Sequence, residues 1–421
     1  MGVTIIAGAQ YGDEGKGRVV DELSSRFDYN VRYQGGDNAG HTVTFGNKEY
    51  IVHLIPSGIF HASVITILGS GMVVNPESIL KEMQMLNDAG FSTENMLISR
   101  DANVLLPFHQ VLDEMRERQE NRIGTTKKGV GFAYADVMTR EALKFFDLLD
   151  ERSFYEKLSE QIATKKKILA GLYNWEGDLG YIVDSARQWR ERLLPHVTDT
   201  KTLLKNAINA GKNVLFEGQL GTMRDINLGV YPYVTSSTTV PAGVSIYEGI
   251  PPDKFENIVG VVKTYETCVG SGPFVTEIFG DVAEHIKQIA NEYGATTKRP
   301  RRIGGLDMLA LKYSVDAAGF NKLALTHLDI LDQFHEIPVC VAYEIDGNRV
   351  DEFTPNRALL EKANPVYEHI PGWKSSTRGM TDASKLPSQA RYFVDFIQSS
   401  TNRPVHMITT GPSRGETIYM K

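Results

Sequence analysis

A glycine-rich loop close to the start of the chain constrains the fold more than any other feature. The loop spans residues 8–17 and reads Gly-Ala-Gln-Tyr-Gly-Asp-Glu-Gly-Lys-Gly. The apolar run Val3–Ala7 before it predicts a strand, and residues 19–27 after it carry apolar side chains at helical spacing. A loop between a strand and a helix in this order favours phosphate binding, because its backbone N–H groups and the helix N-terminus attract anions.

This loop departs from the Walker A pattern. Its first glycine lies two residues too far from Gly15-Lys16, and Gly17 occupies the position of the Ser or Thr that holds magnesium. It also carries the acid pair Asp13-Glu14, although a phosphate cradle normally avoids negative charge. A carboxylate at this point suits a metal ion, the removal of a proton, or both. The competing interpretation is that the glycines form only a tight turn.

A second polar loop follows the next predicted strand, Val31–Tyr33. It spans residues 34–42 and contains three glycines together with Asn38 and His41. A lone histidine after a glycine is usually only a polar loop residue. Here one β–α-like unit separates the histidine from a phosphate-type loop. His41 is therefore a candidate catalytic residue in a site that both loops would form.

Composition bounds the class of protein. The chain has 421 residues, of which 42% are hydrophobic and 23% charged, which predicts a large folded core. Its net charge of -7 argues against a general nucleic-acid or membrane-surface binder. Two cysteines form no disulfide framework or metal quartet, as expected for a cytoplasmic protein. The chain shows no apolar run long enough to span a bilayer.

Strand and helix signals alternate along the chain. A buried strand is predicted at Val64–Leu68, with a turn at residues 69–71, and Asn75-Pro76 opens a helix. Residues 154–209 read as mostly helical, and the run 165–167 of three lysines reads as a solvated face. Further strands are predicted at residues 213–216, 258–263, 323–326 and 405–409. We therefore predict one large α/β domain, residues 1–421, around a mostly parallel sheet with helical and hairpin insertions.

The two loops together resemble those of the adenylosuccinate synthetases, a family of purine-pathway ligases. The resemblance rests first on Gly12–Gly17 and on residues 34–42. It continues along nearly the whole chain, in segments 53–58, 123–126, 216–218, 231–237, 291–297 and 410–412. So many ordered matches imply common descent, and with it a P-loop-like loop for GTP.

The resemblance implies a reaction and roles for the two loops. In this family GTP is the phosphoryl donor, IMP the acceptor and L-aspartate the amine, with one Mg²⁺ in each active site. Asp13 matches the general base and magnesium ligand, and His41 matches the acid that stabilises the transferring phosphoryl group. Gly40 would offer its carbonyl to magnesium, Lys16 would neutralise phosphate charge, and Asn38 would bond near the 6-position of the purine.

The same resemblance implies the remaining ligand contacts. IMP would also contact Thr126, Thr235, Gln219, Leu220 and Arg140, the last from the partner subunit of a homodimer. L-Aspartate would contact Thr296, Thr297, Arg299 and Arg301. GTP would contact Gly12, Gly15, Lys16, Gly17, Gly40, Thr42, Arg301, His327, Asp329, Thr409, Thr410 and Gly411, with Asp329 reading the guanine base. No nucleic acid or membrane partner is expected.

The chain also departs from the family pattern close to these contacts. The family usually has Glu-Gly-Ala-Gln-Gly where residues 217–221 read Glu-Gly-Gln-Leu-Gly. The glutamine that contacts the 6-oxygen region is thus Leu220, and Gln219 lies one position earlier, where the direction of a side chain usually differs. Lysine at 327, arginine at 268, glycine at 127 and 298, and proline at 132 and 275 are replaced by His327, Cys268, Lys127, Lys298, Phe132 and Val275.

Three functions are therefore weighed. The first is adenylosuccinate synthesis, which the presence of Asp13, Asn38 and His41 favours. The second is a ligase of the same chemistry with an altered purine nucleotide or amino acid, motivated by Leu220 and Cys268. Phage relatives that act on a guanine nucleotide alter the position of Asp13, and its retention argues against that version. The third is a catalytically silent nucleotide-binding protein.

Overall fold

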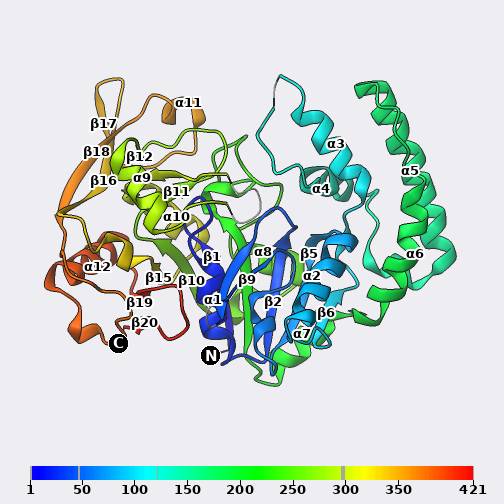
Figure 1. Ribbon diagram of the computed structural model, residues 1–421, viewed down its shortest axis with the longest axis horizontal. Coiled ribbons are helices and arrows are strands. Elements are labelled where there is room, and N and C mark those ends of the chain that lie inside the picture. The colour runs from blue at the N-terminus through cyan, green and yellow to red at the C-terminus, as the bar shows by residue number, and fades with distance from the viewer. Residues whose placement is uncertain (1, 46–47, 121, 295–298, 421) are drawn as a thin grey trace.

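A mostly parallel sheet organises the computed structural model, which describes residues 2–45, 48–120, 122–294 and 299–420. Among these residues the sheet has 11 strands in the order β20-β19-β15-β10-β1-β9-β2-β5-β6-β8, with β7 paired to β5 (Figure 1). Every pairing is parallel except that of β19 with β20. Its strands are β1 Val3–Gly8, β2 Tyr29–Gly35, β5 Ile65–Val74, β6 Met96–Ser99, β7 Asn103–Val104, β8 Val197–Thr198, β9 Val214–Gly221, β10 Phe255–Lys263, β15 Lys322–Thr326, β19 Val405–Thr409 and β20 Thr417–Tyr419.

Smaller sheets are inserted between these strands. They comprise β3 His41–Phe45 with β4 Lys48–Val52; β11 Glu266–Cys268 with β12 Glu277–Ile278 and β13 Arg302–Gly304; and β14 Leu306–Asp307 with β16 Glu336–Ile345, β17 Asn348–Val350 and β18 Asn364–Pro371. All their pairings are antiparallel except that of β14 with β16. The predicted hairpin insertions are thus present.

Helices cover both faces of the main sheet. They are α1 Lys16–Ser24, α2 Pro76–Asp88, α3 Pro107–Glu117, α4 Val130–Thr139, α5 Glu151–Tyr173, α6 Tyr181–Leu193, α7 Thr200–Asn209, α8 Ala242–Glu248, α9 Asp281–Ile289, α10 Met308–Ala318, α11 Arg357–Leu360 and α12 Ser388–Thr401. Alternation along β1 explains the layers: Ile5 packs in one cluster with Val244 of α8, and Ile6 packs in another with Val19 of α1. The α/β prediction is confirmed, and a single domain over residues 1–421 stays a prediction.

One predicted turn is wrong. Residues 69–71 continue β5 as a strand instead of turning the chain. A side chain at Gly69 would meet the Glu248 carboxyl group at 2.3 Å, and one at Gly71 would meet the Tyr247 ring at 2.3 Å. The two glycines therefore let α8 approach the sheet closely, a tertiary reason that local sequence does not reveal.

The lysine run in α5 is only partly a solvated face. Lys166 and Lys167 are exposed, but Lys165 is buried, and its Nζ lies 2.5 Å from Asp136 Oδ1. His109 Nε2 contacts the other oxygen of Asp136 at 3.0 Å. This buried triad joins α5 to α4 and α3, so the prediction is wrong for Lys165 because α5 packs against the body of the molecule at that point.

The other predicted boundaries agree closely. Asn75 caps α2 by accepting hydrogen bonds from Glu77 N and Ser78 N at 3.0 and 3.2 Å. Residues 154–209 are mostly helical, in α5, α6 and α7. Within the described part of the chain, every helix is too short or too polar to cross a lipid bilayer.

Candidate active site

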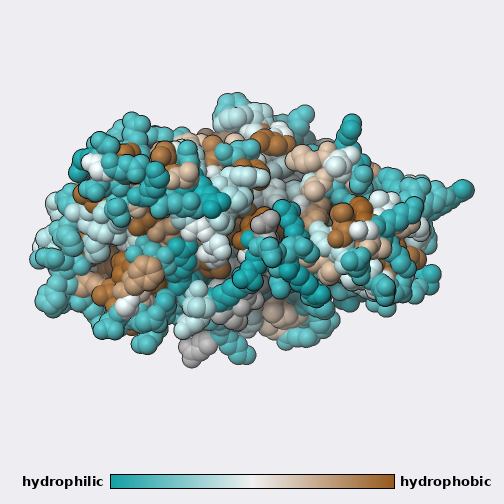
Figure 2. All heavy atoms as spheres, turned by 90° about the horizontal axis from the view of Figure 1, so that it is seen from above, coloured by the Kyte–Doolittle hydropathy of each residue, from teal (hydrophilic) through white to brown (hydrophobic). Residues whose placement is uncertain are grey.

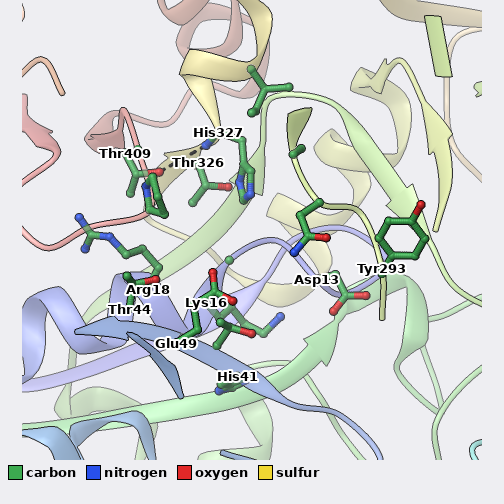
Figure 3. Close-up of a pocket in the computed structure, with 18 of the residues that line it drawn as sticks. Asp13, Lys16, Arg18, His41, Thr44, Glu49, Tyr293, Thr326, His327 and Thr409 are labelled. Carbon is green, nitrogen blue, oxygen red and sulfur yellow. Dashed lines mark hydrogen bonds between the residues drawn. The ribbon is translucent and has the colours of Figure 1, made fainter. Parts of the chain in front are cut away.

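A cavity of about 500 Å³ lies beyond the carboxyl ends of the central strands. Its walls come from α1 and the loop before it, from β3 and β4, and from the residues that follow β15 and β19. Figure 3 shows Lys16 between His41 and His327 in this view, with Asp13 to one side, near Tyr293. Figure 2, which views the molecule from above, shows mainly hydrophilic residues, with hydrophobic ones gathered in separate patches.

Most of the predicted GTP contacts meet in this cavity. Lining residues that the sequence pointed to are Asp13, Gly15, Lys16, Gly17, Gly40, His41, Thr42, Leu220, Arg301, His327, Asp329, Thr409 and Gly411. Thr410 is buried instead, and its hydroxyl group donates to Met380 O at 2.8 Å. Gly12 is not part of the cavity wall, and its N–H group donates to Glu14 Oε1 at 2.8 Å.

The acid pair of the glycine-rich loop divides into two roles. Glu14 is buried and holds the loop, since its carboxylate accepts the N–H groups of Gly12 and Gln10 and pairs with Lys16 Nζ at 2.5 Å. Asp13 has a left-handed backbone, with φ 58°, and its carboxylate reaches the cavity. Such a backbone is costly for a residue other than glycine, and here it occurs at a residue that lines the cavity.

The absence of a Walker-type hydroxyl group at position 17 has a steric reason. A side chain at Gly17 would place its Cβ 2.8 Å from the Cβ of His41. The glycine therefore lets the second loop lie against the first turn of α1. Gly15 caps this helix with backbone alone, without a side-chain hydrogen bond, so the first-turn N–H groups face the cavity end of the helix.

His41 is held by a buried carboxylate. Its Nδ1 contacts Glu217 Oε1, while Ser57 donates to Glu217 through its N–H group and its hydroxyl group, both at 2.8 Å. Burial lowers the pKa of His41, and the negative charge of Glu217 opposes that shift. Although burial alone would raise it, the neighbouring His41, Arg32 and Ser57 hold the pKa of Glu217 below its ordinary value. The pair is therefore a carboxylate and a neutral imidazole that donates from Nδ1.

Asp13 is tied to a network of buried charges. Arg301 Nε donates to Asp13 Oδ2 at 3.0 Å, and Arg301 Nη1 donates to Glu292 Oε2 at 2.6 Å. Lys263 Nζ, itself buried, lies 2.9 Å from Glu292 Oε1. Burial alone would raise the pKa of Glu292, but Lys263 and Arg301 hold it at about 2. Glu292 thus stays ionised and fixes the direction of Arg301.

The residues expected around the nucleobases have distinct environments. Burial lowers the pKa of His327 to about 3, so its imidazole is neutral at pH 7. The backbone N–H group of His327 donates to Thr409 Oγ1 at 3.3 Å, the contact drawn dashed in Figure 3. Burial also raises the pKa of Asp329 to about 6, which leaves this carboxyl group mostly ionised at pH 7.

The glutamine shift at residues 219–220 has a structural resolution. Gln219 is buried, and its Nε2 donates to Asn38 Oδ1 at 2.8 Å. The register between β1 and β9 jumps here, from Ile6 opposite Glu217 to Gly8 opposite Gly221, and Leu220 has a left-handed φ of 63°. This bulge directs the Gln219 amide to Asn38 and the Leu220 side chain to the cavity.

Several expected substrate residues lie outside the cavity wall. Thr126 is half-buried in a loop that Asp113 and Glu117 of α3 hold by hydrogen bonds to Thr125, Gly124 and Gly129. Thr235 is half-buried, and Arg140 and Arg299 are exposed. Thr296 and Thr297, like Lys298, lie outside the described residues.

Sequence reasoning missed the supporting carboxylates Glu217 and Glu292. Both lie inside segments that carry the family resemblance, and Glu217 directly follows the apolar residues Val214–Phe216 of a strand. A charged residue next to the apolar residues of a buried strand is rarely tolerated without partners, so the sequence did carry a signal for Glu217.

Comparisons with known proteins agree along the full chain. The family model described as adenylosuccinate synthetase matches residues 5–418. Adenylosuccinate synthetases from Geobacillus sp. and Listeria monocytogenes are each 41% identical over 424 residues, covering 100% of this chain and 99% of theirs.

Solved structures give the same result. The fully ligated adenylosuccinate synthetase from Plasmodium falciparum has a TM-score of 0.94 and 34% identity, with 100% of both chains covered. A succinoaminodeoxyadenylate synthetase from cyanophage S-2L shares the fold, with a TM-score of 0.63 and 18% identity over 99% of this chain and 95% of that one. The chain belongs to the adenylosuccinate synthetase family of GTP-dependent ligases.

Proposed function

We propose that this protein ligates L-aspartate to IMP, with GTP as phosphoryl donor, and releases adenylosuccinate, GDP and phosphate. The oxygen at C6 of a purine is a very poor leaving group until it is phosphorylated. Transfer of the γ-phosphoryl group of GTP to that oxygen gives 6-phosphoryl-IMP. The amine of aspartate then attacks C6. The bond between C6 and oxygen breaks, and that oxygen leaves as part of phosphate. The reaction needs a base, a triphosphate cradle and charge stabilisation in one cavity.

Asp13 is the proposed base that removes the N1 proton of IMP. Its carboxylate is also the proposed Mg²⁺ ligand, together with the carbonyl group of Gly40, and both residues line the cavity. No cluster of three or more metal-binding side chains occurs among the described residues. One carboxylate from Asp13 and one carbonyl group from Gly40 fit Mg²⁺, which commonly takes one or two carboxylates and completes its shell with substrate phosphates and water. Bound Mg²⁺ would neutralise charge on the phosphates.

His41 is the proposed proton donor to the transferring phosphoryl group. Without substrate, burial and the positive neighbours Arg32 and Lys16 lower the pKa of its imidazole. A triphosphate adds negative charge beside the ring and reverses this balance, so that the imidazolium form becomes favourable. Glu217 on Nδ1 would stabilise that form and direct Nε2 at the phosphoryl oxygen.

The nucleobases have separate proposed partners. Asp329 would accept the N1–H and amino groups of guanine, with Thr409 and Gly411 beside it. Asn38 and Gln219 would contact the 6-position of IMP, and their mutual hydrogen bond of 2.8 Å supports this pairing. Gln219 thereby supplies the amide that Leu220 lacks, which favours IMP over an altered purine.

The remaining contacts complete the proposal. Arg299 and Arg301 would bind the carboxylates of L-aspartate, since a guanidinium group grips a carboxylate at two points. Arg140 would reach the IMP phosphate of the partner subunit in a homodimer. It is exposed at the left-handed end of α4, next to Met138, whose side chain is 77% exposed. Both features suit a surface that a second copy covers.

The observation that carries the proposal is the meeting of Asp13, Lys16 and His41, from two separate loops, in one cavity. An absorbance assay of purified protein with IMP, GTP, Mg²⁺ and L-aspartate tests it, by following formation of the 6-amino-substituted purine. We expect turnover with IMP and none with GMP or dGMP. Turnover only with GMP or dGMP would identify a ligase of altered substrate, and silence with every pair would leave a nucleotide-binding protein.

A further inference from the structure

Arg224 joins three segments that surround the proposed IMP site. It ends the short 3-10 helix Thr222–Arg224 that follows β9, and its guanidinium group is the centre of the contacts. Nη1 donates to Tyr233 O at 2.5 Å, and Nη2 donates to Val269 O at 2.7 Å and to Cys268 Sγ at 2.9 Å. The group also lies over the ring of Tyr11, 5.7 Å from its centroid.

Two of these segments lead to a residue with a proposed role. Tyr11 precedes Gly12 and Asp13 in the glycine-rich loop. Tyr233 precedes Thr235, whose N–H group donates to the carbonyl group of Arg224 at 2.8 Å. Arg224 thus holds the segment of Thr235 at two points, with its backbone and with its side chain.

The segment after Cys268 is held at its other end by a second arginine. Arg302 Nη1 donates to Gly272 O at 2.9 Å and Arg302 lies over the Phe274 ring, 5.3 Å from its centroid. The Tyr233 ring fills the space beside Gly272, where an added Cβ would lie 2.6 Å from it. The 231–235 and 268–272 segments therefore pack on each other, and Arg224 lies between them.

We propose that Arg224 is a positioning residue for the IMP site, which it holds in shape by fixing Thr235 and residues 268–272. This inference rests on the proposed function. A planar guanidinium group with five N–H donors can serve two carbonyl groups and a sulfur at once, which a lysine ammonium cannot do in one plane. The same contacts account for Cys268 in place of the arginine usual in the family, because a second guanidinium group at position 268 would repel that of Arg224.

Two variants and one matched control test this role. Arg224→Met keeps the length of the side chain but removes its donors, and Arg224→Met combined with Cys268→Arg returns a guanidinium group from the opposite side. Arg357→Met is the control, since Arg357 also lies over the Tyr233 ring, at 5.5 Å from its centroid, but is exposed to solvent. The KM values for IMP and for GTP are measured separately for each protein.

We expect Arg224→Met to raise the KM for IMP about 10- to 100-fold, the size of effect that loss of a residue orienting a ligand contact commonly has, with the KM for GTP unchanged. The double variant regains part of this loss, and the control resembles the parent protein. An unchanged KM for IMP in Arg224→Met, an equal rise in both KM values, or a double variant no better than the single one would overturn the inference.

A second measurement separates this inference from the proposed function. Failure of the parent protein to form adenylosuccinate would contradict the function alone. Amide hydrogen exchange without ligand then decides the role of Arg224. Faster exchange in residues 231–237 and 268–272 of Arg224→Met, with the rest unchanged, supports it, and exchange at the parent rates in both segments refutes it.

Discussion

Glu217 shows how a single buried residue prepares the candidate site. The imidazole of His41 has two nitrogens, and only a partner on one of them fixes the direction of the other. Glu217 is that partner, and Ser57 holds Glu217 in turn with two hydrogen bonds of 2.8 Å. The orientation of His41 thus depends on residues that do not reach the cavity wall.

Replacement of Glu217 by glutamine is expected to lower kcat about 10- to 100-fold, as loss of a residue that orients a functional histidine commonly does. The KM for GTP stays near its parent value, since no GTP contact is removed. Ser57→Ala, which removes only one of the hydrogen bonds to Glu217, serves as the milder control. Steady-state kinetics would contradict the role if Glu217→Gln kept its kcat and lost only affinity.

The glutamine that lies one position early, at Gln219 with Leu220 after it, marks the limit of prediction for single residues. Sequence alone indicates that a shift by one position changes the direction of a side chain, because neighbours in a strand point to opposite faces. The two side chains do differ in direction, since Leu220 lines the cavity and Gln219 bonds to Asn38. The rule does not show which of them points where, because β9 bulges and Leu220 adopts a left-handed φ of 63°. A bulge depends on the register with β1, which local sequence does not contain.

At the scale of elements, α3, α4 and α5 are joined by buried side chains, and α3 holds the loop of Thr126. Asp136 in α4 links Lys165 of α5 to His109 of α3, and all three side chains are buried. α4 ends at Arg140, and α3 holds the loop of Thr126 through Asp113 and Glu117. In Figure 1, α5 and α6 lie at the edge of the molecule away from the elements that contain the C-terminus.

Lys165→Met is expected to lower the free energy of unfolding by about 3 kcal/mol, because breaking a buried ion pair leaves a charge without its full compensation. Lys166→Met removes the neighbouring exposed lysine and should change it by no more than about 0.5 kcal/mol. Urea denaturation of both variants measures the difference. Equal stabilities would show that the contact of Lys165 with Asp136 contributes little.

Element types were predicted better than their contacts. The strands β1, β2, β10, β15 and β19 were found from apolar runs, and the Asn75 cap located α2. The turn assigned to residues 69–71 was wrong because glycine served close packing by α8. A glycine in a sequence can indicate either a turn or the close packing of a neighbouring element, and only the tertiary structure shows which of the two applies.

At the scale of the whole molecule, the sheet order could not be read from the sequence. β1 lies between β9 and β10, strands that are more than 200 residues away in the chain. The resemblance to a known family nevertheless identified residues that meet at the cavity. Asp13, His41, Asp329 and Thr409 come from four separate segments of the chain, and all four line it. Pattern alone supplied the loops, and the family resemblance supplied their convergence.

The proposed homodimer gives a prediction about mixed subunits. Arg140→Leu and Asp13→Ala should each abolish or strongly reduce activity alone. Mixing them after dissociation and reassociation restores one complete site in each mixed dimer, so about a quarter of the parent activity returns for a statistical mixture. Activity assays before and after mixing measure this. A mixture that stays inactive, although mixed dimers have formed, would contradict a shared site.

The most direct test of the central claim is the fate of the oxygen at C6 of IMP. The protein is supplied with IMP labelled with ¹⁸O at that position, GTP, Mg²⁺ and L-aspartate, and the released phosphate is analysed by mass spectrometry. Transfer through 6-phosphoryl-IMP predicts one ¹⁸O atom in each phosphate, in equal amount to the adenylosuccinate formed. Phosphate without ¹⁸O would mean that water receives the phosphoryl group of GTP, and would contradict the proposed chemistry at Asp13 and His41.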